Sequence, residues 1–197
     1  MTSRRIGVFV SGTGRHLDNL ARIASAGEMD FEIGLVVSNK TGILALERAT
    51  RRGLETLVLD PERELDTAAF SHSAFEAVEE AGCDTVVLAG FLRRLAIPQR
   101  WAGRVLNIHP ALLPAFGGKG YYGDKVHAAV LERGCQFTGC SVHYVDDEYD
   151  HGPILLQRCI EVRANDTVRT LADRVFAEEE LALPAALAQH FERTAAS

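Results

Sequence analysis

The sequence predicts an α/β fold: a Rossmann-like, mostly parallel sheet with helices on both faces and mixed strands in the C-terminal half. Short, continuous apolar runs alternate with segments of helical periodicity through the first half of the chain. Such runs are typical of parallel strands that helices cover on both faces. The length of 197 residues, with 47% hydrophobic and 24% charged residues, fits one globular domain over residues 1–197.

The first half of the chain alternates strands with helices, and each predicted helix stops at a glycine, as many helices do. The strands are expected at Ile6–Val10, Phe31–Val37, Glu55–Leu59, Thr85–Ala89 and Arg104–Ile108, and the helices at Asp18–Ala26, Ile43–Arg52 and Thr67–Ala81. Ligands of such sheets bind beyond the carboxyl ends of the strands. Three segments lie at such ends, namely Ser11–Gly14, Ala89–Phe91 and Asn107–Pro110.

The second half changes character after a glycine-rich loop at Pro114–Gly120. Helices are expected at Asp124–Arg133, Thr167–Glu180 and Pro184–Glu192, and strands at Ser141–Val145 and Ile154–Val162. The acidic loop Asp146–Gly152 joins these two strands. This half therefore predicts a strand pair and two separate C-terminal helices.

Composition narrows the class of partner. The net charge of −6 argues against nucleic acid, which needs a basic face. The apolar run after Met1–Arg5 is too short for a signal peptide, and no stretch has the length of a membrane-spanning helix. We expect a cytoplasmic protein with small-molecule partners and no membrane partner, either a monomer or a homodimer. The four cysteines form no CxxC pair, which favours reduced thiols over a zinc site or disulfide.

Ser11-Gly12-Thr13-Gly14 follows a predicted strand and opens a helix. Glycines let the backbone approach a ligand closely, and a helix N-terminus offers N–H donors to phosphate. Position 17 is Leu17, so the third glycine of the dinucleotide fingerprint is missing, and the Walker lysine is missing too. The segment therefore has two interpretations, a tight structural turn or a monophosphate site.

Two further segments offer an amide, an imidazole and a carboxylate: Asn107-Ile108-His109-Pro110, and the acidic loop that ends in Asp150-His151-Gly152-Pro153. Asn107 can donate hydrogen bonds, and a nearby carboxylate orients an imidazole and favours its charged form. These groups suit a reaction in which charge builds on a carbonyl oxygen while a proton moves. No serine or cysteine nucleophile accompanies them, which favours direct acyl transfer. His109 alone could equally be a core or turn residue.

Other polar residues have simpler interpretations. His127 and His143 lie inside a predicted helix and strand, where we expect packing or surface roles. The acidic loop could hold a metal, but no spaced set of His or Cys ligands accompanies it, so no metal is predicted.

Together these residues resemble the folate-dependent formyltransferases, nearest to the branch that formylates 5-phosphoribosylglycinamide in purine (IMP) biosynthesis. The likeness covers essentially the whole chain, and the combination of NIHP-x-LLP with DE-x-D-x-GP is specific to this catalytic domain. The matching segments are Val8–Gly14, Leu88–Arg93, Asn107–Pro114 and Gly139–Gln157. The resemblance implies an N-terminal phosphate-binding half of about residues 1–100 and a catalytic, folate-binding half of about 101–197.

The resemblance also implies roles for individual residues. The catalytic set would be Asn107, His109 and Asp150, and the co-substrate would be 10-formyltetrahydrofolate. The folate would contact Leu92, Arg93, Leu95, Val145, Asp146 and Asp147; the substrate phosphate would lie on Gly12, Thr13 and Gly14; Glu179 would contact the ribose. Leu113-Pro114 matches a cis peptide of the family.

One departure from the family bears on the substrate. Arg15-His16 stands where the family usually has a small polar residue and Asn, so Arg15 and His16 either strengthen phosphate binding, face solvent, or mark a changed substrate. The loop Phe116–Tyr122 is long and glycine-rich, as a cover over the site would be.

Three alternative functions remain open. The chain could be a formyltransferase for another amine, such as methionyl-tRNA or an amino sugar. It could also be a formyltetrahydrofolate hydrolase, or a folate- or nucleotide-binding protein without activity.

Overall fold

The computed structural model describes residues 4–59 and 66–195. Contacts divide the chain into two compact units, Met1–Leu106 and Asn107–Ser197, with the boundary inside strand β5. Hydrogen bonds order the strands β3-β2-β1-β4-β5-β6-β7 in one sheet. The predicted α/β class with a mostly parallel sheet is confirmed.

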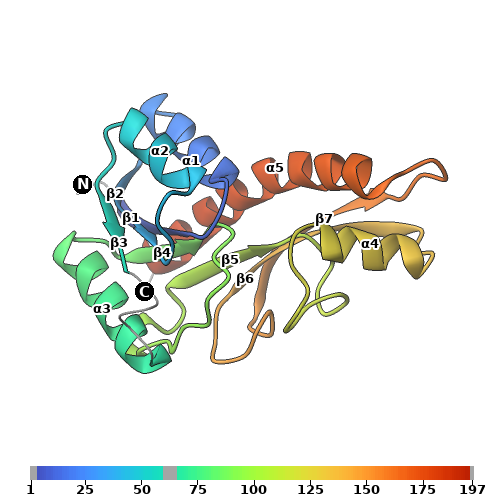
Figure 1. Cartoon of the computed structure of the whole chain (residues 1–197). Helices are drawn as coiled ribbons and strands as arrows, with labels where there is room; N and C mark the ends of the chain where they lie inside the picture. Colours follow the sequence, from blue (N-terminus) through green and yellow to red (C-terminus); the bar gives the residue numbers. More distant parts are fainter. Residues whose placement is uncertain (1–3, 60–65, 196–197) are drawn as a thin grey trace. The chain divides into compact units, whose positions relative to one another are not determined.

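The first unit is a parallel sheet covered by helices on both faces. Its strands are β1 Arg4–Val10, β2 Phe31–Ser38, β3 Thr56–Val58, β4 Thr85–Leu88 and the start of β5 Val105–His109, and its helices are α1 Arg15–Ser25, α2 Leu44–Arg51, α3 Thr67–Glu80 and the short 3-10 helix η1 Gln99–Trp101. Strand β1 pairs in parallel with β2 and β4, and β2 with β3. Helices α1 and α2 lie on one face and α3 on the other (Figure 1).

Aromatic side chains fill the α3 side of this unit. Phe9 of β1 lies 5.4 Å from Phe91 and 6.1 Å from Phe75 between ring centroids, and Phe75 lies 5.3 Å from Trp101. Phe9 and Phe75 are fully buried. Burial of rings of this size is a large part of what holds a helix on a sheet, so this packing fixes the strand ends that carry the candidate loops.

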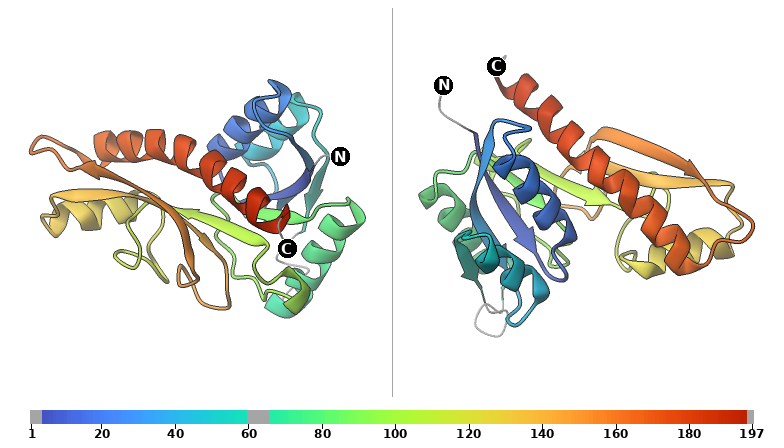
Figure 2. Two further views of the ribbon diagram at one scale, coloured as in Figure 1. Left: turned by 180° about the vertical axis from the view of Figure 1, so that it is seen from behind. Right: turned by 90° about the horizontal axis from the view of Figure 1, so that it is seen from above.

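The second unit contains α4 Asp124–Glu132, β6 Phe137–Tyr144, β7 Ile154–Glu161 and α5 Val168–Ala195. Strands β6 and β7 form an antiparallel pair, and α5 packs on both strands and on α4. Figure 2 shows the N-terminal part of α5 lying beside this strand pair. The predicted change from parallel to mixed strands is thus confirmed.

Two predicted boundaries are wrong. Thr167–Glu180 and Pro184–Glu192 are not separate helices, because α5 continues through Pro184. A proline removes one backbone hydrogen bond, but Leu183 and Leu187 beside it are buried, and that burial favours a continuous helix. The strand expected from Ser141 already begins at Phe137, because pairing with β7 extends it backwards.

Candidate active site

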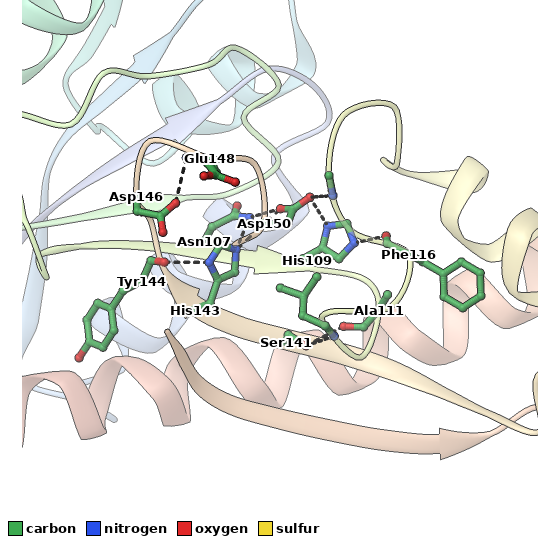
Figure 3. Close-up of polar contacts among 12 residues, drawn as sticks. Asn107, His109, Ala111, Phe116, Ser141, His143, Tyr144, Asp146, Glu148 and Asp150 are labelled. Carbon is green, nitrogen blue, oxygen red and sulfur yellow. Dashed lines mark hydrogen bonds and ion pairs between the residues drawn. The ribbon is translucent and has the colours of Figure 1, made fainter. Parts of the chain in front are cut away.

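The predicted catalytic set comes together within residues 107–195. Asn107 and His109 end strand β5, and their spacing of two puts both side chains on one face of the sheet. Asp150 belongs to the loop between β6 and β7. Figure 3 shows the three side chains pointing toward one another. These residues, distant in sequence, therefore meet because the end of β5 and the loop between β6 and β7 lie next to each other.

Distances define a compact polar cluster. The Asn107 amide nitrogen donates to Asp150 Oδ1 at 3.2 Å. His109 Nδ1 lies 3.5 Å from Asp150 Oδ2, and the two side chains are only 5% and 11% exposed. A carboxylate this buried interacts strongly with its neighbours because little water screens it. The cluster can therefore orient an imidazole and an amide toward a developing charge.

His143 also belongs to this cluster: it is buried, as the predicted packing role requires, and its ring contacts two of the three predicted residues. Its Nε2 lies 3.1 Å from the Asn107 amide nitrogen and 3.7 Å from Asp150 Oδ1. Its Nδ1 lies 2.9 Å from the Tyr144 carbonyl oxygen, which can only accept, so Nδ1 carries a proton. In the neutral ring Nε2 then accepts from Asn107. The available signal was alternation: Ser141 and His143 are polar positions two apart in a buried strand.

The glycine-rich loop closes on the same cluster. The Phe116 carbonyl oxygen lies 2.8 Å from His109 Nε2, so that nitrogen is a donor. The Gly118 N–H donates to Asp150 Oδ2 at 2.9 Å. A side chain at Gly117 would place its Cβ 2.5 Å from a Leu113 methyl group and 3.2 Å from the Asp150 Cβ. Glycine at this position therefore allows the loop to reach the cluster, and sequence reasoning missed both backbone contacts.

Asp150 is poised as an anion. Burial raises the pKa of its carboxyl group, but the nearby His143 ring, the charge of His109 and the Gly118 N–H together outweigh burial and hold that pKa below its usual value. The carboxylate is therefore charged at neutral pH and can accept protons only transiently. This is the electrostatic condition for a residue that aligns an imidazole and passes on a proton.

The backbone around Asp150 and Leu113 is tightly constrained. Asp150 has φ 54°, a left-handed conformation uncommon for a non-glycine residue. The fully buried Ser141 donates to the Ala111 carbonyl at 2.7 Å and accepts from the Leu113 N–H at 3.0 Å. The predicted cis peptide between Leu113 and Pro114 is present. These contacts hold the segment after His109 against strand β6.

The predicted phosphate loop lies in the first unit. Gly14 has φ 72° and is the N-cap of α1, which has no side-chain cap. A helix N-terminus carries N–H groups and a partial positive charge, which suits an anion. The Ser11 hydroxyl donates to the Asn39 side-chain oxygen at 2.6 Å and accepts from the Leu92 N–H at 3.0 Å. These two hydrogen bonds hold the start of the loop in place. Gly12, Thr13 and Arg15 are exposed.

The remaining predicted residues differ in exposure. In the first unit His16 is half-buried, Leu92 is 48% exposed, Leu95 is buried, and the Arg93 guanidinium lies 4.2 Å from the Phe70 ring centroid. In the second unit Val145 and Asp146 are half-buried, Asp147 is exposed, and Glu179 is 6% exposed. Each unit thus carries part of the predicted folate and substrate contacts. Within the acidic loop, Asp146 pairs with His151 at 2.8 Å, and this contact orders the loop.

Across residues 4–59 and 66–195, no three or more His, Cys, Asp or Glu side chains are grouped as a metal site would require. The same part of the chain contains no helix with both the length and the apolar character needed to cross a bilayer. All four cysteines lie among these residues and are unpaired, with Cys83 and Cys140 buried and Cys159 exposed.

Comparison with known proteins identifies the family. The sequence profile described as Formyl transferase matches residues 4–187. The chain belongs to the formyl transferase family. Among curated members, phosphoribosylglycinamide formyltransferase, chloroplastic, of Arabidopsis thaliana is 41% identical over 179 residues, which cover 89% of this chain and 61% of that protein. The human trifunctional purine biosynthetic protein adenosine-3 is 39% identical over 185 residues, 93% of this chain.

The chain spans only part of these curated members, 18% of the human protein and 61% of the Arabidopsis protein. Solved family members are closer in length. The phosphoribosylglycinamide formyltransferase from Bacillus halodurans superposes with a TM-score of 0.88 at 30% identity, covering 98% of this chain and 97% of that one. The glycinamide ribonucleotide transformylase 1 from Symbiobacterium toebii gives 0.87 at 36% identity, covering 93% and 85%.

Proposed function

We propose that this chain transfers the formyl group of 10-formyltetrahydrofolate to the primary amine of 5-phosphoribosylglycinamide. The observation that carries the proposal is the buried cluster of Asn107, His109 and the anionic Asp150. Family members with solved structures and nearly the same length bear the names of enzymes that formylate this ribonucleotide. The acidic composition supports small-molecule substrates rather than nucleic acid.

The residues of the cluster divide the chemistry. The substrate amine attacks the formyl carbon, and the oxygen of the tetrahedral intermediate takes its hydrogen bonds from the Asn107 amide and the His109 imidazole. Asp150 holds His109 and helps a proton move from the attacking nitrogen to the departing folate nitrogen. Each preorganised donor of this kind contributes about 10²–10³ in rate. No covalent enzyme intermediate is needed, because the cluster holds no serine or cysteine nucleophile.

The glycine-rich loop controls access to these donors. In this structure His109 Nε2 donates a hydrogen bond to the Phe116 carbonyl oxygen, and the Gly118 N–H donates to one oxygen of Asp150. For either group to act on substrate, the loop must exchange these bonds for substrate contacts. Loop closure of this kind is a common way to exclude water, so Phe116–Tyr122 acts as the cover of the catalytic cluster.

Substrate contacts are proposed residue by residue. The uncapped start of α1 supports phosphate binding at Gly12, Thr13 and Gly14, with Arg15 and His16 beside it. The buried Glu179 is proposed to contact the ribose. Leu92, Arg93, Leu95, Val145, Asp146 and Asp147 are proposed to contact the folate.

A turnover assay tests the proposal directly. Purified protein is mixed with 10-formyltetrahydrofolate and 5-phosphoribosylglycinamide, folate release is followed by absorbance, and the product is identified by mass spectrometry. We expect the formylated ribonucleotide from wild type and about 10²–10⁴-fold slower turnover from Asp150→Asn, with substrate binding retained.

The same assay separates the alternatives. Folate release without a formylated ribonucleotide would indicate a hydrolase. Absence of both products, with folate binding intact, would indicate another acceptor amine or a binding protein without activity. Near-normal turnover in Asp150→Asn would refute the proposed role of the cluster. Because Arg15 is exposed at the start of α1, Arg15→Ser then tests whether it binds the substrate phosphate, through a rise in KM.

A further inference from the structure

The first unit carries a groove at the opposite end of α1 from the proposed phosphate loop. It lies where α1 ends and β2 begins, whereas the loop Ser11–Gly14 lies where β1 ends and α1 begins. The groove has a volume of about 560 Å³. This is the range of small-molecule sites, about 300–1,000 Å³. Neither the cluster around Asp150 nor the loop before α1 contributes a residue to it.

The floor of the groove is apolar. Ala21 and Ala24 of α1 are three positions apart and share one helix face, and Phe31 and Ile33 of β2 are two apart and share one strand face. Leu54 completes the floor. Two alanines leave open the space that larger side chains would fill. The floor therefore offers a flat apolar group a surface between a helix and a strand.

The rim of the groove is positively charged. Arg51 and Arg52 line it and also line an adjoining recess of about 360 Å³ together with Asp18 and Arg48. Asp18 accepts from Arg48 at 2.8 Å through one oxygen and from Arg52 at 2.7 Å through the other. Two of the three guanidinium groups in this recess, those of Arg48 and Arg52, thus share a single carboxylate, and Arg51 does not pair with it.

Two of these arginines have donor capacity that their neighbours do not use. Among the described residues, the Arg51 side chain makes one hydrogen bond, a long contact of 3.4 Å from Nε to the Glu47 carbonyl oxygen. Arg48 Nε is buried with no hydrogen-bond partner among the same residues. Arginines favour a helix C-terminus on electrostatic grounds, which explains why they end α2. That preference does not explain why Arg51 and Arg52 also line an apolar groove, and guanidinium donors beside an apolar floor fit a ligand with an anionic part and an apolar part.

We propose that this groove binds a small molecule made of a flat apolar group and one anionic group, such as a carboxylate, sulfonate or phosphate. The apolar part packs on Ala21, Ala24 and Phe31, and the anion accepts hydrogen bonds from Arg51 and Arg52. Glu32 also lines the groove and opposes the anion by charge. The site is independent of formyl transfer and gives the chain a second ligand-binding surface.

The test uses 8-anilino-1-naphthalenesulfonate as the anionic probe and N-phenyl-1-naphthylamine as its neutral counterpart, both titrated by fluorescence. The wild-type protein should bind the sulfonate about tenfold more tightly than the neutral probe. Arg51→Gln should weaken sulfonate binding about threefold to tenfold, and Ala24→Leu, which fills the floor, about tenfold. Glu32→Gln should tighten it.

Arg22→Gln is the matched control, because Arg22 is an exposed arginine of the same helix α1 that pairs with Glu28 outside the groove. It should leave both affinities unchanged. Sulfonate affinities within about twofold of wild type in Arg51→Gln and Ala24→Leu, or equal binding of both probes, would overturn the proposal. Arg51 is exposed, so its variant remains informative if Ala24→Leu fails to fold. Formyl transfer measured on the same samples is expected to be unchanged, which separates this proposal from the catalytic one.

Discussion

Replacing His143 tests whether this buried ring positions the proposed oxyanion donor. His143 is 1% exposed, and its two nitrogens have different partners, the Asn107 amide at 3.1 Å and the Tyr144 carbonyl at 2.9 Å. Two nearly isosteric substitutions separate the effects of these two contacts. His143→Asn keeps a donor near Tyr144 but removes the acceptor for Asn107. His143→Gln keeps a polar group at the Nε2 position, where it can still accept from Asn107.

The magnitude follows from what Asn107 loses. Without the Nε2 acceptor, Asp150 at 3.2 Å is the remaining partner of its amide group among the contacts in this cluster. One neutral hydrogen bond contributes about 0.5–1.5 kcal/mol, which sets a lower limit of about twofold to tenfold on kcat. Complete loss of an oxyanion donor sets the upper limit at about 10²–10³-fold. We expect about 10–100-fold for His143→Asn and less than about fivefold for His143→Gln.

The assay is steady-state formyl transfer with both substrates varied. A positioning residue lowers kcat and leaves KM unchanged, because His143 touches Asn107 rather than the substrate. His190→Asn is the matched control: His190 is also 1% exposed and lies in the second unit, where it contacts the Tyr144 hydroxyl at 3.2 Å. That variant should lose stability but keep kcat. Equal kcat in His143→Asn and His143→Gln would refute the reasoning.

Three further predictions concern the support of the site. Ser141→Ala removes a buried hydroxyl with three hydrogen-bond partners, so Tm should fall by about 5–10 °C in a thermal melt. Gly152→Ala would bring a Cβ within 2.0 Å of the Tyr144 carbonyl oxygen, so the loop must shift, and kcat should fall by about 10²-fold. The hydrogen bond with Asp146 raises the pKa of His151, so their ion pair stabilises the fold below the unfolded pKa of His151 and is lost as pH rises through the raised folded value. The Tm difference between wild type and His151→Asn should therefore be positive near pH 6 and vanish near about pH 9; a constant difference would contradict the pairing.

Most of the fold could be predicted because periodicity and glycine punctuation report local structure. The helix expected at Thr67–Ala81 forms at Thr67–Glu80, and Gly82 after it has φ 70°. The helix expected from Asp18 begins instead at Arg15, because Gly14 in a left-handed conformation turns the chain directly from the loop into the helix. Continuity of α5 through Pro184 depends on burial against other elements, and local propensity carries no information about that burial.

The candidate site was predictable where its chemistry resides in side chains. Asn107, His109 and Asp150 stood out because amide, imidazole and carboxylate form a coherent chemical set. The Phe116 carbonyl and the Gly118 N–H could not be recognised, because every residue offers these groups and only folding selects which of them reach the site. His143 fell between the two cases, since its residue type was informative but its direction depended on strand register.

The loop contact on His109 has a consequence for rate under the proposed function. The Phe116 carbonyl and the formyl oxygen of the bound substrate are both neutral acceptors, so they compete for His109 Nε2 on similar terms in the ground state. When the amine adds, the substrate oxygen becomes an anion, and its hydrogen bonds become about twice as strong. The anion then displaces the carbonyl, whereas the neutral substrate oxygen has no advantage over it. The gain arises only in the transition state, and interactions of that kind raise kcat rather than merely tightening substrate binding.

The glycines at 117 and 118 make this exchange possible. Gly117 allows the backbone to approach Asp150, and Gly118, which has φ 92°, lets the backbone turn there. The loop thus occupies the His109 donor until charge develops on the substrate.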